Sequence, residues 1–165
     1  MPFVFAGPLL TLSFTGGGSI CAVPVPDEIA DALGAAGVRR VVGTMEGPGG
    51  SADFNLALLG KRGGPRHLMV SRARMRALGA EPGSTLGVEM VPDPTPDDVA
   101  VPDELVAALA DNPVAAERFA AMTPGRRRSL VHHVTAARRA ETRLDRARDL
   151  AHKLATHTLY GDKQP

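Results

Sequence analysis

A short motif occurs twice in the first half of the chain and constrains its fold more than any other feature. Residues 32–37 read Ala-Leu-Gly-Ala-Ala-Gly, and residues 77–83 read Ala-Leu-Gly-Ala-Glu-Pro-Gly. Each copy ends a short helical pattern and lies between two strand-like runs, at 20–25 and 38–44 for the first copy and at 67–70 and 86–91 for the second. A residue that follows a helix often adopts a left-handed conformation, in which glycine avoids the Cβ penalty, so Gly34 and Gly79 are expected to end the two helices. The motif predicts two strand–helix–strand units packed with approximate internal symmetry.

Glycine-rich turns separate the other apolar runs of residues 1–91. Candidate strands at 9–14 and 52–58 border such turns, and the first of them runs into Thr-Gly-Gly-Gly-Ser. About six strands with two short helices predict a small, partly closed six-stranded β-barrel, which would also protect the sheet edges. Prolines at 92, 94, 96 and 102 lie among aspartates and can continue neither a helix nor a central strand. We therefore expect a domain boundary there.

The sequence after this boundary has a helical pattern. Asn112-Pro113 and Thr123-Pro124 have the order of an N-cap residue followed by proline that begins many helices. Beyond the second pair, apolar residues recur every three, four or seven positions in a helical region that ends near Thr158, and this spacing predicts one apolar stripe: Leu130, Val134, Ala137, Leu144, Ala147, Ala151 and Leu154. The expected α+β protein thus has a β-barrel domain at 1–92, a Pro/Asp-rich linker at 93–100, a helical segment at 101–158 and a tail at 159–165.

Composition restricts the classes of function. The single cysteine, Cys21, excludes an intrachain disulfide and a multi-cysteine metal site, and an aromatic content of 4% leaves few stacking surfaces for bases. No leading basic residue precedes the apolar N-terminus, and no run approaches the ~18 apolar residues of a membrane span, so we expect a cytoplasmic protein with no membrane partner. Residues 123–165 contain 10 Lys and Arg against 4 Asp and Glu, whereas residues 1–122 contain 9 against 14. The basic end could bind an anionic partner or the acidic part of its own chain.

Two stretches resemble known families. Phe119-Ala-Ala-Met-Thr-Pro124, the basic run 126–128, Ala137-Arg138 and Glu141-Thr-Arg-Leu-Asp-Arg146 resemble the C-terminal helical segment of the bacterial YdeI/OmpD-associated family, also called bacteriocin-protection proteins. Residues 42–47, 66–70 and 76–79 with Gly83 resemble the small β-barrel domain of unknown function that often precedes this segment. The chain departs from these patterns at His132-His133, where the family tends to have an aromatic residue, and at Gly83-Ser84, where the barrel domain usually has Gly-Asp. The resemblance implies the fold and the domain order, and the family name suggests a role in stress or bacteriocin protection.

No motif predicts a catalytic residue, a metal site or a cofactor. The glycine-rich turns at 16–19 and 60–64 lack the lysine–hydroxyl pair and the helix of a phosphate-binding loop, so both are interpreted as hairpin turns. The five histidines have no zinc-ligand spacing, and no serine lies in a Gly-x-Ser-x-Gly elbow. An enzyme with a site between the barrel and the helices is therefore the least favoured hypothesis.

Arginines of the C-terminal helices are the candidate binding residues. They can hold carboxylates or phosphates through bidentate hydrogen bonds, and the candidates are Arg126, Arg127, Arg128, Arg139, Arg143 and Arg146. The structural alternative for Arg143 and Arg146 is a clamp on carboxylates of the β-domain or on helix carbonyls, and the sequence favours it. The leading hypothesis is a non-catalytic module that binds a protein or a small anionic ligand on this basic face and on the loops at 46–51 and 60–66. The alternative is sequence-independent nucleic-acid binding through phosphates.

Overall fold

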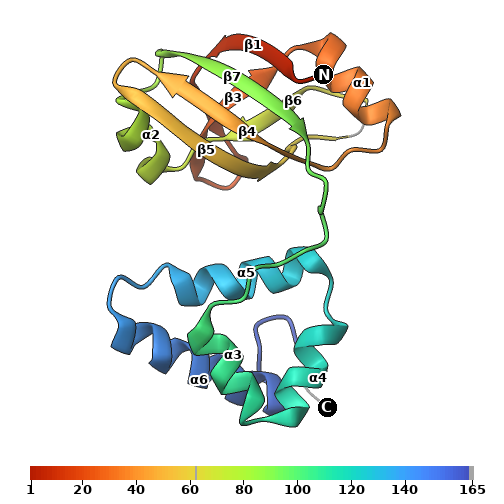
Figure 1. Cartoon of the computed structure of the whole chain (residues 1–165), viewed down its shortest axis with the longest axis vertical. Coiled ribbons are helices and arrows are strands. Elements are labelled where there is room, and N and C mark those ends of the chain that lie inside the picture. The colour runs from red at the N-terminus through yellow and green to blue at the C-terminus, as the bar shows by residue number, and fades with distance from the viewer. Residues whose placement is uncertain (62, 164–165) are drawn as a thin grey trace. The chain divides into compact units, whose positions relative to one another are not determined.

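The chain forms two compact units (Figure 1). The computed structural model describes residues 1–61 and 63–163. The first unit, called the β unit, spans Met1–Pro96, and its described residues form seven strands and two helices. The second, called the helical unit, begins at Asp97, and its described residues form four helices. The predicted α+β class is therefore confirmed. Arg62 of the 60–66 loop and the last two residues of the expected tail lie outside the described residues.

Two antiparallel sheets make up the β unit. The first has the strand order β1-β7-β4-β5 and the second the order β2-β3-β6. Helix α1 lies between β3 and β4 in the chain, and helix α2 lies between β6 and β7. The elements are β1 (Phe3–Pro8), β2 (Leu10–Ser13), β3 (Ser19–Val25), α1 (Asp27–Ala35), β4 (Arg40–Gly47), β5 (Gly50–Ala57), β6 (Arg66–Met69), α2 (Arg72–Leu78) and β7 (Thr85–Pro92).

The predicted six-stranded barrel is not confirmed, because seven strands form two sheets and no closed barrel is found in the described part of the chain. The difference arises at Leu9, a buried residue where the N-terminal apolar run leaves the first sheet and enters the second. The backbone of Leu9 pairs with the turn before β7, since its N–H donates to Ser84 O at 2.8 Å and its carbonyl accepts from Gly83 N at 2.8 Å. One run of apolar residues therefore gives two strands.

The duplicated motif marks a pseudo-two-fold axis. Helices α1 and α2 begin 45 positions apart in the sequence, and so do β4 and β7. Strand β3 pairs with β6 so that Val23 faces Leu68, and β4 pairs with β7 so that Thr44 faces Glu89. The two residues of each pair are also 45 positions apart, so equivalent residues of the two copies face each other in both sheets. The described elements thus include the two strand–helix–strand units expected from the motif.

Glycine ends both helices of the repeat, but at different positions of the motif. Gly79 follows α2 with a φ of 59°, as predicted. Gly34 lies inside α1, and the left-handed residue is Gly37, with a φ of 70°. The same pair of backbone hydrogen bonds closes each helix: Val38 N to Leu33 O and Gly37 N to Gly34 O after α1, and Ala80 N to Met75 O and Gly79 N to Arg76 O after α2. The prediction for Gly34 was wrong because helix α1 continues to Ala35, whereas α2 ends at Leu78.

The hairpin between β4 and β5 packs its backbone against the end of α2. Gly49 N donates to Leu78 O at 2.9 Å. A Cβ atom on Gly47 would lie 2.8 Å from Leu78 Cβ and closer still to the Leu78 carbonyl oxygen, and one on Gly50 would lie 2.6 Å from Ala77 O. The glycines of the 46–51 loop, part of the predicted binding surface, therefore serve this close approach.

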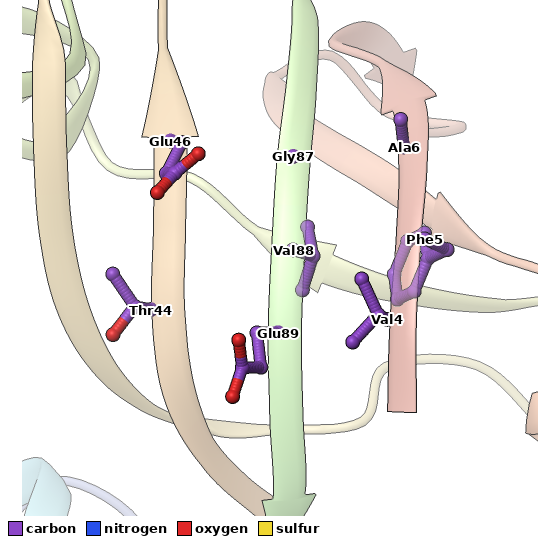
Figure 2. Close-up of a pocket in the computed structure, with 8 residues that line it drawn as sticks. All are labelled: Val4, Phe5, Ala6, Thr44, Glu46, Gly87, Val88 and Glu89. Carbon is purple, nitrogen blue, oxygen red and sulfur yellow. The ribbon is translucent and has the colours of Figure 1, made fainter. Parts of the chain in front are cut away.

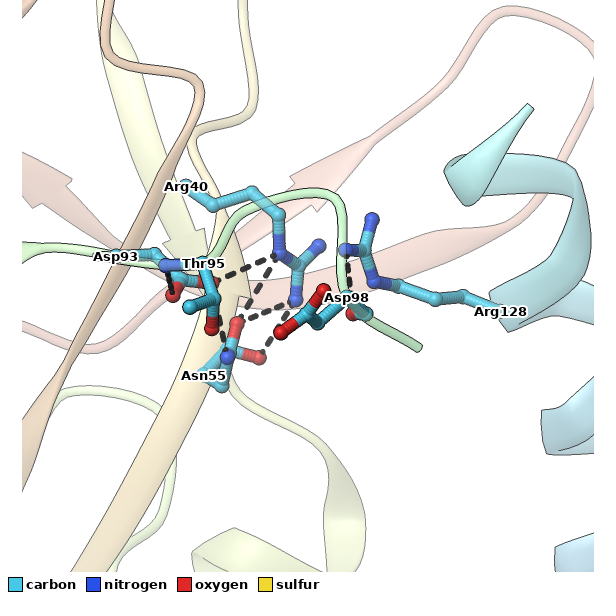
Figure 3. Close-up of polar contacts among 6 residues, drawn as sticks. All are labelled: Arg40, Asn55, Asp93, Thr95, Asp98 and Arg128. Atoms are coloured by element: carbon cyan, nitrogen blue, oxygen red, sulfur yellow. Dashed lines mark hydrogen bonds and ion pairs between the residues drawn. The ribbon is translucent and has the colours of Figure 1, made fainter. Parts of the chain in front are cut away.

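A polar network holds the end of β7 (Figure 3). Asp93 is the one buried charged or polar residue of the described chain, at 8% exposure. Its Oδ2 accepts from Asn55 Nδ2 at 3.0 Å and lies 3.7 Å from Arg40 Nε, and its Oδ1 accepts from Thr95 N at 3.0 Å. Arg40 also donates from Nε to Asn55 Oδ1 at 3.1 Å. These contacts satisfy a buried carboxylate and fix the direction in which the chain leaves β7.

Four helices pack around the core of the helical unit: α3 (Asp103–Ala110), α4 (Pro113–Ala121), α5 (Pro124–Thr135) and α6 (Ala140–Thr156). The predicted N-caps of α4 and α5 are confirmed, because Asn112 Oδ1 accepts from Ala115 N and Thr123 Oγ1 accepts from Arg126 N. Leu105, Leu154 and Val134 have no exposed surface. None of the helices in the described chain combines the length and hydropathy of a membrane span.

The predicted apolar stripe runs over two helices instead of one region. The helical region breaks at 136–139, between α5 and α6. Val134, Ala147, Ala151 and Leu154 are buried as the stripe requires, but Leu144 is 38% exposed. Leu144 lies on the same face of α6 as Ala147 and Ala151 but nearer the start of the helix, where this face is more exposed.

Candidate anion-binding groove

A hollow of about 300 Å³ lies between α5, α6 and the turn that follows α6. We call it the α5–α6 groove. Its floor includes Leu130, Leu150 and Leu159, and the last two are buried in the core of the helical unit. Polar and charged side chains line the rest, so an apolar base lies beneath a polar rim. The lining residues are Arg126, Ser129, Leu130, His133, Asp149, Leu150, Lys153, Thr158, Leu159 and Tyr160.

Helical spacing brings the lining residues of each helix to one side. Arg126, Leu130 and His133 are four and three positions apart on α5, which places them on one face. Leu150 and Lys153 are three positions apart on α6, next to Asp149. The N-cap Thr123 fixes the start of α5, and with it the position of Arg126 in the first turn.

The turn after α6 forms the third wall. His157 ends α6 in the left-handed conformation with a φ of 55°, and Thr158 N donates to Lys153 O at 3.1 Å. Leu159 N donates to Asp162 Oδ2 at 2.8 Å. Arg118 Nη1 of α4 donates to Leu154 O at 3.0 Å, and Arg118 Nη2 donates to Asp162 Oδ1. The Arg118 hydrogen bond holds the pKa of the Asp162 carboxyl below its ordinary value.

The rim of the groove carries more positive than negative charge. Arg126 Nη2 donates to Tyr160 O at 2.7 Å, which takes one of the five N–H donors of its guanidinium. Lys153 Nζ lies 2.8 Å from Asp149 Oδ2 in an ion pair whose side chains are about half exposed, 46% and 52%. The groove is therefore suited to a ligand that has an anionic group and an apolar part.

Arg143 and Arg146, two of the predicted arginines, donate to groups of the helical unit and do not line the groove. Arg143 Nε donates to Glu104 Oε1 of α3 at 2.7 Å, and Arg143 Nη1 donates to the carbonyls of Ala137 and Arg138 at 3.3 and 3.1 Å. The hydrogen bond from Arg143 lowers the pKa of the Glu104 carboxyl. Arg146 Nη1 donates to His133 O near the end of α5, at 2.8 Å. Arg143 and Arg146 thus bind carbonyls at and just after the end of α5, which was one of the two structural alternatives. The carboxylate that Arg143 binds, Glu104, belongs to the helical unit and not to the β-domain, where the sequence analysis had placed it.

The other candidate arginines do not form one cluster around the groove. Only Arg126, of the six predicted residues, is among those that line it. Arg128 Nη2 donates to Asp98 O at 3.0 Å (Figure 3). Arg127 has a buried Nε atom with no hydrogen-bond partner among the described residues. Arg139 is the exposed N-cap residue of α6 and makes no side-chain cap hydrogen bond.

His133, Lys153 and Tyr160 are groove residues that the sequence did not predict. The i, i+7 spacing of Arg126 and His133 was a usable signal for α5. No comparable signal joined them to Lys153 or Tyr160, because the pairing of α5 with α6 and the path of the turn depend on tertiary packing. Across residues 1–61 and 63–163, no three His, Cys, Asp or Glu side chains gather where they could hold a metal ion.

A second hollow lies on the β unit, on the face of the first sheet (Figure 2). Its volume is about 470 Å³, and it lies at the β4–β7 pair that includes Thr44 and Glu89. Glu46 and Glu89 come from the neighbouring strands β4 and β7, and the exposed Val4 of β1 borders them. This surface differs in charge from the α5–α6 groove, since none of the eight described residues that line it is basic.

The helical unit matches a known family. Residues 98–157 match the family model OmdA, described as bacteriocin-protection, YdeI or OmpD-associated. This match confirms the resemblance of the C-terminal helical segment and spans helices α3, α4, α5 and α6. The β unit lies outside the match, so the resemblance of its residues to a small β-barrel domain stays a prediction. No curated protein and no solved structure matches the chain.

Proposed function

We propose, from the family match and the α5–α6 groove, that this protein is a non-catalytic binding module that takes part in bacteriocin protection in the bacterial cytoplasm. Its ligand is a protein segment or small molecule with an anionic group and an apolar part. The match supports this proposal because residues 98–157 include both helices of the groove. The single observation that carries the proposal is the hollow with a leucine floor beneath the side chains of Arg126, His133 and Lys153.

An anionic group fits the groove better than a neutral one. Most N–H donors of Arg126 are not taken by Tyr160 O, and Lys153 and Asp149 form an exposed pair that a ligand carboxylate can enter at little cost, because such pairs contribute only about 0.2–1 kcal/mol. The buried Leu150 and Leu159 give the ligand an apolar base. A carboxylate or phosphate attached to a short apolar group has both features.

Nucleic-acid binding through all six arginines has weaker support. Arg143 and Arg146 donate to carbonyls of the helical unit, so moving them to phosphates would leave those acceptors and Glu104 without their partner. An enzyme also has weaker support, because no motif of the sequence places a nucleophile beside a general base.

The test compares groove variants with a matched surface variant. The double variant His133→Glu and Lys153→Glu adds a negative charge at one exposed groove position and reverses a positive charge at another. The control Arg148→Glu reverses a positive charge at an exposed position of α6 that does not line the groove. Bacteria that express each form are challenged with a bacteriocin, and their survival is counted. We expect the unaltered chain and Arg148→Glu to protect and the double variant not to protect. Equal protection by the double variant, at equal protein level, would refute the role of the groove.

A direct binding assay separates the ligand classes. A labelled acidic peptide with one leucine and a labelled random-sequence DNA duplex are titrated with the full chain at ~50 and ~200 mM salt, and the anisotropy is measured. The proposal predicts that the peptide binds and that its affinity falls about tenfold or more in the double variant. Steep salt-dependent binding of the duplex, lost when Arg126, Arg127 and Arg128 become alanine, would favour the nucleic-acid alternative instead.

A further inference from the structure

Besides the hollow on the face of the first sheet, the β unit has another hollow, and the bacteriocin-protection proposal uses neither of them. It has a volume of about 420 Å³ and lies beside α2 and the segment after it. We call it the α2 hollow. Its lining residues are Arg72, Met75, Arg76, Gly79, Ala80, Glu81 and Pro82. The sequence analysis used this stretch for the repeat and for the resemblance to a small β-barrel domain, and named no binding residue in it.

The base of the α2 hollow is apolar and adaptable. Met75 and Ala80 are partly buried and pack against the core of the β unit, and Gly79 contributes no side chain. Pro82 completes the apolar part of the lining. Methionine is flexible and polarisable, so it can fit apolar groups of different shape. The base therefore suits a single apolar side chain from outside the chain.

The backbone around the α2 hollow is fixed before any ligand binds. Ala80 N donates to Met75 O at 2.9 Å, which closes the end of α2. Glu81 N donates to Ser84 Oγ at 3.0 Å, and Ser84 N donates to Glu81 O at 2.9 Å. Gly79 lies against Gly49 of the neighbouring hairpin so closely that a Cβ atom would be 2.8 Å from Gly49 Cα. A pre-formed hollow binds with a smaller loss of conformational entropy.

The rim of the α2 hollow carries charge of both signs at separate positions. Arg72 and Arg76 are exposed and four residues apart on α2, so they lie on one side of the helix. Within the described residues neither guanidinium has a hydrogen-bond or ion-pair partner. Glu81 is exposed and lies beyond the end of α2, on the other side of Gly79. The rim therefore presents two cations at α2 and one anion at the segment that follows it.

We propose that the α2 hollow binds a segment of a partner protein in which an apolar residue lies between acidic residues on one side and a basic residue on the other. The apolar side chain occupies the base beside Met75 and Ala80. The acidic side chains bind Arg72 and Arg76, which can each hold a carboxylate in a bidentate way, and the basic side chain pairs with Glu81. A nucleic acid fits less well, because its phosphates would face Glu81 and its backbone would leave the apolar base uncovered.

Peptide selection tests this proposal without a guess at the exact sequence. A random 12-residue peptide library is selected against the immobilised full chain, and enriched peptides are counter-selected against the double variant Arg72→Glu and Arg76→Glu. These positions are exposed, so the variant is expected to fold as the unaltered chain does, which circular dichroism checks. The control variant is Arg148→Glu, an exposed arginine of α6.

We expect the enriched peptides to share an acidic–apolar–basic arrangement, read in one of the two chain directions. A labelled synthetic peptide of that order should bind about tenfold or more weakly to the double variant and unchanged to Arg148→Glu. When the peptide is added to the full chain, the backbone amide chemical shifts of residues 72–82 should change. Replacing the acidic residues of the peptide by lysine should restore binding to the double variant, as complementary charges require.

Other outcomes would overturn the inference. Enriched peptides without an acidic bias, no enrichment at all, or equal affinity for the double variant would each contradict it. Chemical-shift changes confined to the α5–α6 groove would show that the peptide binds elsewhere. Self-association of the chain through residues 72–82 would show that a second copy of the chain, and not a partner peptide, occupies the hollow. The bacteriocin-protection proposal is tested by separate residues of the helical unit, so either proposal can fail without the other.

Discussion

Replacing Gly47 by alanine would put a methyl group where the end of α2 already lies. The new Cβ atom would be 2.8 Å from Leu78 Cβ, and nearer still to the Leu78 carbonyl oxygen, whereas carbon atoms in contact normally lie roughly 3.5–4.0 Å apart. The β4–β5 hairpin must therefore move away from α2 by roughly 1 Å. This movement would stretch the 2.9 Å hydrogen bond from Gly49 N to Leu78 O.

The cost of Gly47→Ala follows from these contacts. Overpacking of this kind costs about 1–3 kcal/mol, and the weakened hydrogen bond costs about 1 kcal/mol. The φ of Gly47 is not in the left-handed region, so alanine offsets about 0.4–1 kcal/mol of this by restricting the unfolded chain. The free energy of unfolding of the β unit should therefore fall by about 2 kcal/mol, which lowers its melting temperature by about 10 °C.

Gly34→Ala is the matched control. Gly34 lies inside α1 of the same unit, and a Cβ atom there would meet nothing within 4 Å. Because glycine in a helix is less stable than alanine by about 0.5–1 kcal/mol, this variant should be more stable than the original chain. Urea unfolding of the full chain is followed by hydrogen exchange of the β4 and β5 amides, which report on the β unit alone. If Gly47→Ala were as stable as Gly34→Ala, the close approach of the hairpin to α2 would be refuted.

Three further predictions concern the helical unit. Leu154→Ala removes a fully buried side chain and should lower the free energy of unfolding by about 2–5 kcal/mol, measured by chemical denaturation; a loss below about 1 kcal/mol would contradict its place in the core. Asn112→Ala removes the N-cap of α4 and should cost about 1 kcal/mol, whereas Asn112→Asp, which keeps the acceptor, should cost little in the same assay. Glu104 and Asp162 have lowered pKa values in the folded chain because Arg143 and Arg118 donate to them. Their stabilisation is complete above the ordinary carboxyl pKa of about 4 and is lost as the pH falls below it, so melting temperatures measured between pH 6 and about 3 should fall less in the charge-removing variant Glu104→Gln than in the original chain.

Local sequence signals predicted the elements of this fold well where one segment alone decides the structure. The N-caps Asn112 and Thr123 and the glycine at Gly79 are local signals, because each acts within a few residues. The signal failed at Gly34, where two glycines of one motif competed to end the helix and Gly37 took the left-handed position. It also failed between α5 and α6, because the helical spacing of apolar residues continues across residues 136–139, where the helix is broken.

The candidate site was predicted only in part, for a related reason. An arginine run shows that cations are present, but not which of them the fold itself uses. Arg143 and Arg146 donate to carbonyls that lie 5 to 13 positions earlier in the chain, near the break between α5 and α6, and Arg143 also binds Glu104 of α3. Arg126 instead lies beside Lys153 and Tyr160 in a groove. Neither outcome follows from spacing along one helix.

The sequence by itself determined the α+β class, the order of strands and helices in the duplicated motif, and the excess of basic residues after position 122. These properties depend on short-range periodicity, turn residues and composition. Only the tertiary structure decided that the N-terminal run divides at Leu9 into strands of two sheets, and that Thr44 faces Glu89 at the pseudo-two-fold axis. It also decided that Arg143 and Arg146 donate to groups near the break between α5 and α6, whereas Arg126 donates to Tyr160 O and lines the groove. The physical reason is that such contacts join residues far apart in the sequence, and their energies depend on burial and geometry that no single segment contains.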